Sequence, residues 1–234
     1  MSASTPSTTP EAQLPSPAPF IEHTLLHPLA GAGDIRRLCA EACRFGFASV
    51  CVAPLHVSLA AELLADSSVR VGTVVGFPLG YTLPAVKIFE TAELVRCGAT
   101  ELDMVISLAK VRDGDFAAVG KEVAAVVSAA RGVPVKAIIE CCYLDETQKV
   151  QLAELVAENG AAFVKTSTGF GSAGALVEDV RLLARAAKGR IGVKAAGGIR
   201  SWEECRRFLA AGATRIGTSS APRIMEEWRG AAAQ

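Results

Sequence analysis

Two lysines at the ends of apolar, strand-like segments are the residues best suited to chemistry in this sequence. Lys165 follows Phe163 and Val164, Lys194 follows Gly192 and Val193, and a glycine-containing turn comes after each. Burying an ammonium group is costly unless it is paired. If the two segments are strands of one sheet, each cation disfavours protonation of the other, which predicts a nucleophilic amine at neutral pH. The alternative is a structural pair, bound to inward carboxylates or reaching solvent at a strand end.

Carboxylates lie in segments of the same kind. Asp103 belongs to an apolar segment, 100–106, whose alternation places it on one face with Glu101 and Val105. A carboxylate there could relay protons through water to a carbonyl carbon, or it could pair with a lysine for purely structural reasons. Lys136 and Glu140 are four residues apart on one strand face, and we expect them to neutralise each other as supporting residues.

Small residues after the last three strand-like segments predict an anion site. Glycine lets backbone N–H groups approach an anion closely, and a helix N-terminus favours negative charge. Each turn alone is a weak signal, but three on neighbouring strands indicate a phosphate. The expected substrate- and phosphate-binding residues are Thr168, Gly169, Gly171, Gly197, Gly198, Gly217, Ser219 and Ser220.

The histidines and cysteines carry weaker signals. His23, His27 and His56 have no metal-ligand spacing, and we expect core or capping roles for them. The seven cysteines contain no CxxC pair, which favours reduced, buried cysteine over a disulfide framework or a zinc site. Cys51 ends a strand-like segment, where packing is its expected role. The sequence therefore predicts no metal and no cofactor.

Composition limits the class of partner. The chain of 234 residues has 24 basic and 24 acidic side chains, so no overall charge draws it to nucleic acid or anionic lipid. No apolar run approaches the roughly 18 residues of a membrane span. Residues 1–19 hold five prolines and seven serines or threonines, which predicts a disordered extension rather than a secretory signal. We expect a cytoplasmic protein.

Strand-like and helix-like segments alternate along the rest of the chain, from 20 to 234. Apolar runs rich in β-branched residues predict eight strands, at 20–25, 49–53, 70–76, 100–106, 133–140, 162–166, 191–195 and 214–217. Amphipathic segments predict helices at 34–45, 55–66, 84–97, 115–131, 144–159, 175–188, 201–211 and about 220–228, with Asp34 and Ser201 as N-caps.

Eight strand–helix units predict a single-domain α/β protein with a (β/α)8 TIM barrel. An open, doubly wound sheet is the rival fold. It is disfavoured because no G-x-G-x-x-G motif follows the first strand and because polar residues recur at the carboxyl ends of the strands. In a barrel, Lys165 and Lys194 would lie on adjacent strands.

Six segments together resemble deoxyribose-phosphate aldolases, and the resemblance covers nearly all of the chain after residue 19. The matching segments are 21–26, 74–80, 101–105, 163–170, 193–199 and 215–220. The resemblance implies a metal-free class I aldolase that reversibly cleaves 2-deoxy-D-ribose 5-phosphate to glyceraldehyde 3-phosphate and acetaldehyde, in deoxyribonucleotide catabolism. It also implies a homo-oligomer, either a dimer or a tetramer.

The resemblance also implies a role for each central residue. Lys165 is the expected Schiff-base lysine, Lys194 the neighbour that lowers its pKa, and Asp103 the proton donor and acceptor together with Lys194. Glu22 and His27 stand where the family usually has aspartate and lysine, a departure that we expect to affect packing or a dimer surface. The C-terminal tyrosine of some members has no counterpart here.

Two other functions fit parts of the pattern. Another phosphate-binding barrel enzyme could use Schiff-base chemistry on a different sugar phosphate, and only turnover would separate it from the first reading. A catalytically silent scaffold would have lost Lys165, Lys194 or Asp103, and all three are present.

Overall fold

The computed structural model describes residues 15–233. Eight strands run in chain order: β1 (Ile21–Leu25), β2 (Ser49–Val52), β3 (Arg70–Val75), β4 (Glu101–Val105), β5 (Val135–Ile138), β6 (Phe163–Lys165), β7 (Gly192–Ala196) and β8 (Arg215–Thr218). The helices are α1 (Ala32–Phe45), α2 (Val57–Leu63), α3 (Pro84–Arg96), α4 (Leu108–Arg112), α5 (Phe116–Ala129), α6 (Glu146–Glu158), α7 (Val177–Ala187), α8 (Trp202–Ala210) and α9 (Ala221–Ala232).

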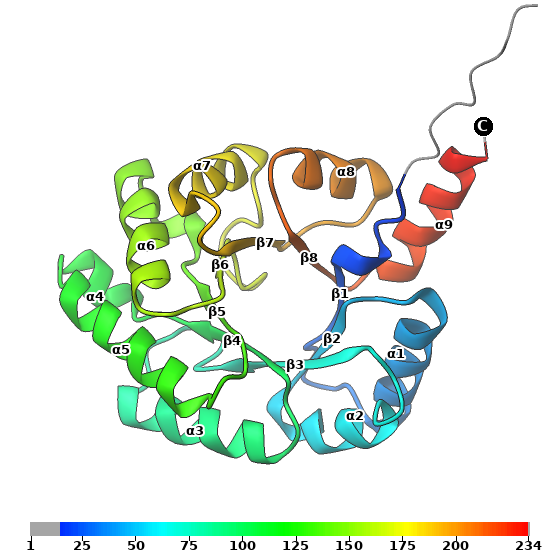
Figure 1. The fold of residues 1–234 in the computed structure, drawn as a ribbon, viewed down its shortest axis with the longest axis horizontal. Coiled ribbons are helices and arrows are strands. Elements are labelled where there is room, and N and C mark those ends of the chain that lie inside the picture. The colour runs from blue at the N-terminus through cyan, green and yellow to red at the C-terminus, as the bar shows by residue number, and fades with distance from the viewer. Residues whose placement is uncertain (1–14, 234) are drawn as a thin grey trace, which may run out of the picture.

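All eight strands are parallel and close into a barrel in chain order, with β8 pairing back onto β1. The helices form an outer ring around the strands (Figure 1). This arrangement confirms the predicted TIM barrel and rules out the open sheet. The pairing of β6 with β7 confirms that Lys165 and Lys194 lie on adjacent strands, and its register places the two lysines directly opposite each other.

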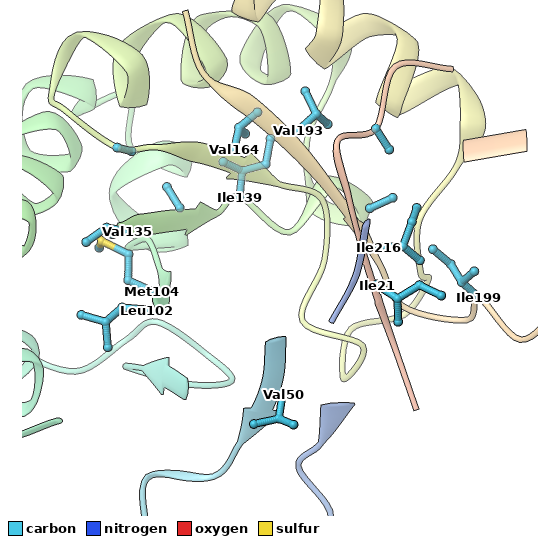
Figure 2. Close-up of a cluster of buried hydrophobic side chains, with 14 of the residues drawn as sticks. Ile21, Val50, Leu102, Met104, Val135, Ile139, Val164, Val193, Ile199 and Ile216 are labelled. Atoms are coloured by element: carbon cyan, nitrogen blue, oxygen red, sulfur yellow. The ribbon is translucent and has the colours of Figure 1, made fainter. Parts of the chain in front are cut away.

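The main hydrophobic core lies between the strands and the helices. Alternate residues of each strand point outward into it, because successive side chains of a strand face opposite sides. Figure 2 shows Ile21, Val50, Leu102, Val164 and Ile216 among this cluster, and all five are buried. The opposite residues of the same strands are left to fill the barrel interior.

The barrel interior is charged, although branched apolar side chains usually fill this space in TIM barrels. Glu22, Glu101, Asp103, Lys136 and Lys194 are at most 1% exposed and point inward from β1, β4, β5 and β7. Such groups are tolerated only when they are paired. The fold thus devotes its least accessible volume to an ion network.

Several predicted boundaries are corrected by the structure. Ala18 lies in a short 3-10 helix and is buried in the core, so the predicted extension 1–19 ends too late, while residues 1–14 lie outside the described residues. Asp34 is not an N-cap: it is the third residue of α1, and its carboxylate accepts the Gly31 N–H. Ser201 does cap α8, as predicted. The short helix α4 was not predicted.

A second buried ion pair anchors the end of β4 from outside the barrel. Lys87 of α3 donates to Glu122 of α5 at 2.7 Å and to the Val105 carbonyl at 2.7 Å. The other Glu122 oxygen accepts the Ser107 N–H at 3.0 Å. The pair therefore links two helices to the strand that carries Asp103.

Lys87→Met is expected to destabilise the protein by about 3–5 kcal/mol, because it leaves the Glu122 charge buried without a cation. Urea unfolding of the two proteins measures the difference. The double variant Lys87→Met, Glu122→Leu removes both charges and is expected to recover much of the loss. A change below about 1 kcal/mol in the single variant contradicts the assignment.

In the part of the chain that the structure describes, all seven cysteines are free and no group of His, Cys, Asp or Glu side chains is arranged to hold a metal ion. Over residues 15–233, none of the helices has both the length and the apolar character needed to cross a membrane.

Candidate active site

One carboxylate organises the centre of the barrel. Asp103 Oδ2 accepts hydrogen bonds from Lys165 Nζ at 2.7 Å and from Lys194 Nζ at 2.6 Å. Its other oxygen, Oδ1, accepts from Lys136 Nζ at 3.1 Å. The structure thus brings together the three residues predicted to carry the chemistry. It also shows that Lys136 is a third lysine bound to Asp103.

Glu22 makes the two central lysines unequal. Its carboxylate accepts a hydrogen bond from Lys194 but not from Lys165, so Lys194 lies between two anions. The expected role of Glu22 in packing or at a dimer surface is therefore wrong. Glu22 is fully buried and belongs to the central ion network.

A deeper layer of charges closes the barrel floor beneath Asp103. Glu101 accepts from Lys136 at 2.8 Å and from Arg215 Nη1 at 3.1 Å, and Arg215 also reaches Glu22 at 3.2 Å. Lys136 therefore pairs with Glu101 and Asp103, which corrects the prediction that it would neutralise Glu140. Arg70 adds a contact to Glu101 at 3.1 Å, but its side chain is half exposed at the end of the barrel.

Counting charges in the buried network indicates which lysine is neutral. The network holds four basic side chains and three carboxylates, which are Lys136, Lys165, Lys194, Arg215, Glu22, Glu101 and Asp103. A buried net charge is costly, so the favoured state has one basic group deprotonated. Lys165 contacts one carboxylate, and each of the other three cations contacts at least two. Lys165 is therefore the basic group of this network that loses its proton most readily.

The directions of the pKa shifts agree with this count. Burial lowers the pKa of Lys165 from its usual 10.5, and the positive charge of Lys194 lowers it further against the opposing pull of Asp103. Burial also disfavours the charged form of Lys194, but Asp103 and Glu22 outweigh burial and raise its pKa. The net pKa shift is therefore downward for Lys165 and upward for Lys194, so only Lys165 becomes the nucleophilic amine expected from the pair.

Asp103 stays ionised for the same reason. Burial alone would raise the pKa of its carboxyl, but the positive charges of Lys136 and Lys194 and the hydrogen bond from Lys165 hold that pKa well below the usual range. The centre therefore consists of a carboxylate, a charged Lys194 and a Lys165 amine that gives up its proton readily.

A cavity of about 330 Å³ opens above Lys165 at the carboxyl ends of β6, β7, β8 and β1. Six of the eight predicted phosphate residues line it: Thr168, Gly169, Gly197, Gly198, Gly217 and Ser219. Gly171 and Ser220 are not among its lining residues. Asp103 and Lys194 lie beneath the cavity, so only Lys165 of the central residues reaches its wall.

Two of the lining residues make contacts within the protein that do not fit the anion-binding role predicted for them. Thr168 donates both its backbone N–H and its hydroxyl to Glu140, so neither group is free for an anion. A Cβ atom on Gly217 would lie 3.0 Å from Lys194 Cε, so this glycine makes room for the lysine side chain. Both were predicted as phosphate-binding residues, but their contacts are with Glu140 and Lys194 inside the protein.

Sequence reasoning missed several residues of the cavity wall. Arg200, His27 and Phe170 line the cavity, and Arg200 forms no ion pair with another described residue. Arg200 could have been found as the first cation after the Gly197-Gly198 turn. Glu22 could have been found as a charge on the inward face of an apolar strand.

The residues predicted to be supporting have structural partners. His23 pairs with Glu41 at 2.7 Å, His56 contacts the Ala30 carbonyl at 2.9 Å, and His27 Nδ1 accepts the Leu29 N–H at 3.2 Å. Burial raises the pKa of the Cys51 thiol to about 11, with a further contribution from Asp103. Cys51 is therefore a neutral side chain at neutral pH, consistent with the packing role expected of it.

A parallel eight-stranded barrel with ionisable side chains and an open cavity at the carboxyl ends of its strands is the architecture of the (β/α)8 enzymes. A family model described as DeoC/LacD family aldolase matches residues 20–230. The chain belongs to this family and is an aldolase, a lyase.

Similar proteins agree with this membership. A deoxyribose-phosphate aldolase of Syntrophotalea carbinolica is 55% identical over 214 residues, which is 92% of this chain and 97% of that protein. One of Thermococcus gammatolerans is 50% identical over 218 residues, with 92% and 97% covered. The tetrameric deoxyribose phosphate aldolase of Aeropyrum pernix has a similar structure, with a TM-score of 0.87, 37% identity and 94% of each chain covered.

Proposed function

We propose that this protein cleaves 2-deoxy-D-ribose 5-phosphate reversibly to D-glyceraldehyde 3-phosphate and acetaldehyde through a Schiff base on Lys165. One observation carries the proposal. Among residues 15–233, Lys165 is the only lysine in the wall of the cavity, and it shares one oxygen of Asp103 with a second, doubly paired lysine. An amine in this setting is a nucleophile for a carbonyl carbon. The names of the relatives supply the substrate.

The bond changes follow from the amine. Lys165 Nζ attacks the C1 aldehyde of the open-chain sugar, and loss of water gives a protonated Schiff base that accepts electrons. Removal of the proton from the C3 hydroxyl breaks the C2–C3 bond. Glyceraldehyde 3-phosphate leaves, and the enamine of acetaldehyde remains on Lys165. Protonation of the enamine at C2 and hydrolysis of the Schiff base then free acetaldehyde and the amine.

Asp103 and Lys194 are the proposed proton donors and acceptors of these steps. Asp103 Oδ2 contacts both amines, so a proton released by Lys165 has an acceptor at 2.7 Å and a second basic group at 2.6 Å from the same oxygen. Water in the cavity would carry protons between this group and the substrate carbons. In this proposal Lys165 itself provides the electron sink, so the reaction uses no metal and no cofactor.

The phosphate is proposed to lie on the far side of the cavity from β4. Gly169, Gly197 and Gly198 present bare backbone there, and Ser219 adds a hydroxyl just before α9 begins. Arg200 supplies the positive charge that the predicted set lacked. Thr168 and Gly217 are proposed to shape this subsite without binding the phosphate, since Thr168 is bonded to Glu140 and Gly217 lies against Lys194.

Borohydride trapping tests the proposal directly. The protein is incubated with acetaldehyde or with deoxyribose 5-phosphate, reduced with sodium borohydride, digested and mapped by mass spectrometry. The expected adduct is an alkylated Lys165. An adduct on another lysine, or none in a preparation that cleaves the sugar phosphate, overturns the assignment of Lys165. Turnover of a different sugar phosphate without turnover of this one overturns the substrate.

The setting of the reaction is proposed with it. We propose a cytoplasmic homo-oligomer, a dimer or a tetramer, that acts in the breakdown of deoxyribonucleotides. Its partners are the sugar phosphate and the aldehydes, with no nucleic acid and no membrane. Light scattering on the purified protein measures the assembly state.

A further inference from the structure

Glu140 is a buried carboxylate that the proposed reaction does not use. It lies two residues after the end of β5, is 2% exposed, and has a backbone φ of 51° in the left-handed region. A residue other than glycine adopts this conformation only where its surroundings enforce it. Among the described residues, no lysine, arginine or histidine forms an ion pair with it.

The hydrogen bonds of Glu140 all lead to one loop. Both carboxylate oxygens accept the Thr168 N–H at 3.2 Å, and Oε2 also accepts the Thr168 hydroxyl. The same hydroxyl oxygen accepts the Phe170 N–H at 3.0 Å. Glu140 therefore reaches the turn from Thr168 to Phe170 through one continuous chain of hydrogen bonds.

The surroundings fix both ends of this chain. Backbone hydrogen bonds from Ile139 to Lys165 and from Cys141 to Thr166, at 3.0 and 2.8 Å, hold the residues on either side of Glu140 to the strand that carries the proposed nucleophile. A Cβ atom on Gly171 would lie 3.1 Å from Glu140 Cδ, so the glycine leaves room for the carboxylate. The need for glycine at position 171 is therefore explained by the nearby Glu140 carboxylate, and not by the anion contact predicted for it.

The loop that Glu140 holds forms one wall of the cavity. Thr168, Gly169 and Phe170 all line it. The Phe170 ring meets the Phe77 ring edge-on, with centroids 5.3 Å apart, so the loop also reaches across the barrel mouth to the segment after β3. A shift of the loop would move the Gly169 backbone and the Phe170 ring together.

We propose that Glu140 is a positioning residue for substrate binding. It holds the 168–171 loop so that the Gly169 backbone faces the phosphate and the Phe170 ring closes the cavity against Phe77. This role rests on the proposed function for the identity of the phosphate. The formation of the Schiff base with a small aldehyde does not depend on it, because Lys165 is held by β6 and Asp103.

Glu140→Gln keeps the size of the side chain and replaces one of the two acceptor oxygens with an NH2 group, which cannot accept a hydrogen bond from Thr168. We expect the KM for deoxyribose 5-phosphate to rise at least about tenfold while kcat changes less than about threefold. Exchange of the acetaldehyde methyl protons with deuterium, followed by NMR, needs no phosphate and is expected to stay within about threefold of wild type. Parallel loss of both activities, or an unchanged KM, overturns the proposal.

Two further variants separate positioning from general damage. Thr168→Val removes the hydroxyl from the other side and is expected to raise the KM as well. Its combination with Glu140→Gln is expected to add less than the sum of the single effects, since both break one contact. Glu158→Gln makes the same charge change on a carboxylate that is 63% exposed on α6, and no parameter is expected to move. Additive effects of Glu140→Gln and Thr168→Val overturn the shared contact.

Hydrogen exchange gives a readout that needs no substrate. Amides of the peptide 166–172 are expected to exchange at least about tenfold faster in Glu140→Gln than in wild type, with the rest of the barrel unchanged. Unchanged exchange in this peptide overturns the role of Glu140 in holding the loop. Failure of wild-type trapping on Lys165 counts instead against the proposed function, so the two failures are distinguishable.

Discussion

Lys165→Leu is expected to lower the rate of deoxyribose 5-phosphate cleavage by a factor on the order of 10⁴ or more, because no other lysine lines the cavity to replace the nucleophile. The fold is expected to survive. The remaining buried network holds three cations and three carboxylates, so removing a neutral amine leaves the charges balanced. A cleavage assay coupled to glyceraldehyde 3-phosphate measures the rate, and thermal unfolding measures stability.

Lys165→Arg is the informative companion to that variant. Guanidinium stays protonated, so arginine introduces a permanent fourth cation into a network with three carboxylates. We expect it to be as inactive as the leucine variant and less stable by about 1–3 kcal/mol. If the leucine variant proves much less stable than the arginine variant, the lysine carries its charge in the resting protein and the charge count is wrong.

The eight strands and their order were accessible from sequence because they depend on local patterns. Apolar runs separated by amphipathic segments specify the barrel, and the barrel makes β6 and β7 neighbours. Lys165 and Lys194 each stand two residues after the start of a short strand, so their pairing follows from strand order. Asp103 was found because it is a charged residue in a mostly apolar segment. A charge in such a position must be paired or serve a function.

The partners of each charge were not accessible in the same way. Lys136 and Glu140 lie on one face of the predicted strand 133–140, which suggested that they neutralise each other. In the structure β5 ends at Ile138, Lys136 turns to Glu101 and Asp103, and Glu140 turns to the next loop. Strand parity gives the side of the sheet on which a residue lies. It does not say which of several opposite charges in a closed barrel will be nearest.

The small residues after the strands show a related limit. Glycine is required wherever backbone or a large side chain comes close, whether the neighbour is a ligand or part of the protein. At Gly217 the neighbour is the Lys194 side chain, and at Gly171 it is the Glu140 carboxylate. Sequence alone could place these glycines near the site but could not distinguish the two uses.

Glu22 is the residue whose partner the sequence did not show. As a single difference from the family pattern it suggested a local change, but its carboxylate lies beside Lys194 and explains why the two lysines differ. Glu22 lies on β1 and Lys194 on β7, and β8 pairs with both of these strands. The glutamate side chain, which is longer than that of aspartate, reaches the lysine past β8. The asymmetry of the pair is therefore a property of three strands together.

Lys194→Leu is expected to reduce cleavage at pH 7 by a factor on the order of 10²–10⁴, through the pKa of Lys165 and through loss of a proton donor. Lys194 now shares Asp103 Oδ2 with Lys165, and its positive charge lowers the pKa of Lys165. Without it, Lys165 is the only lysine on Asp103 Oδ2, the repulsion from Lys194 is gone, and the pKa of Lys165 rises. Each unit of that rise lowers the neutral fraction of Lys165 about tenfold at any pH below the new value.

The pH profile separates this mechanism from simple loss of structure. The Lys165 amine is reactive when neutral, so activity falls as the pH drops below its pKa, and a raised pKa moves this acid limb to higher pH. We expect the limb of kcat/KM to shift upward in Lys194→Leu and the variant to recover part of its rate in alkaline buffer. Lys121→Leu, on the exposed face of α5, is the matched control and is expected to keep the wild-type profile. A wild-type rate and limb in Lys194→Leu would mean that burial beside Asp103 is sufficient to activate Lys165. The doubly paired lysine would then serve the ion network alone.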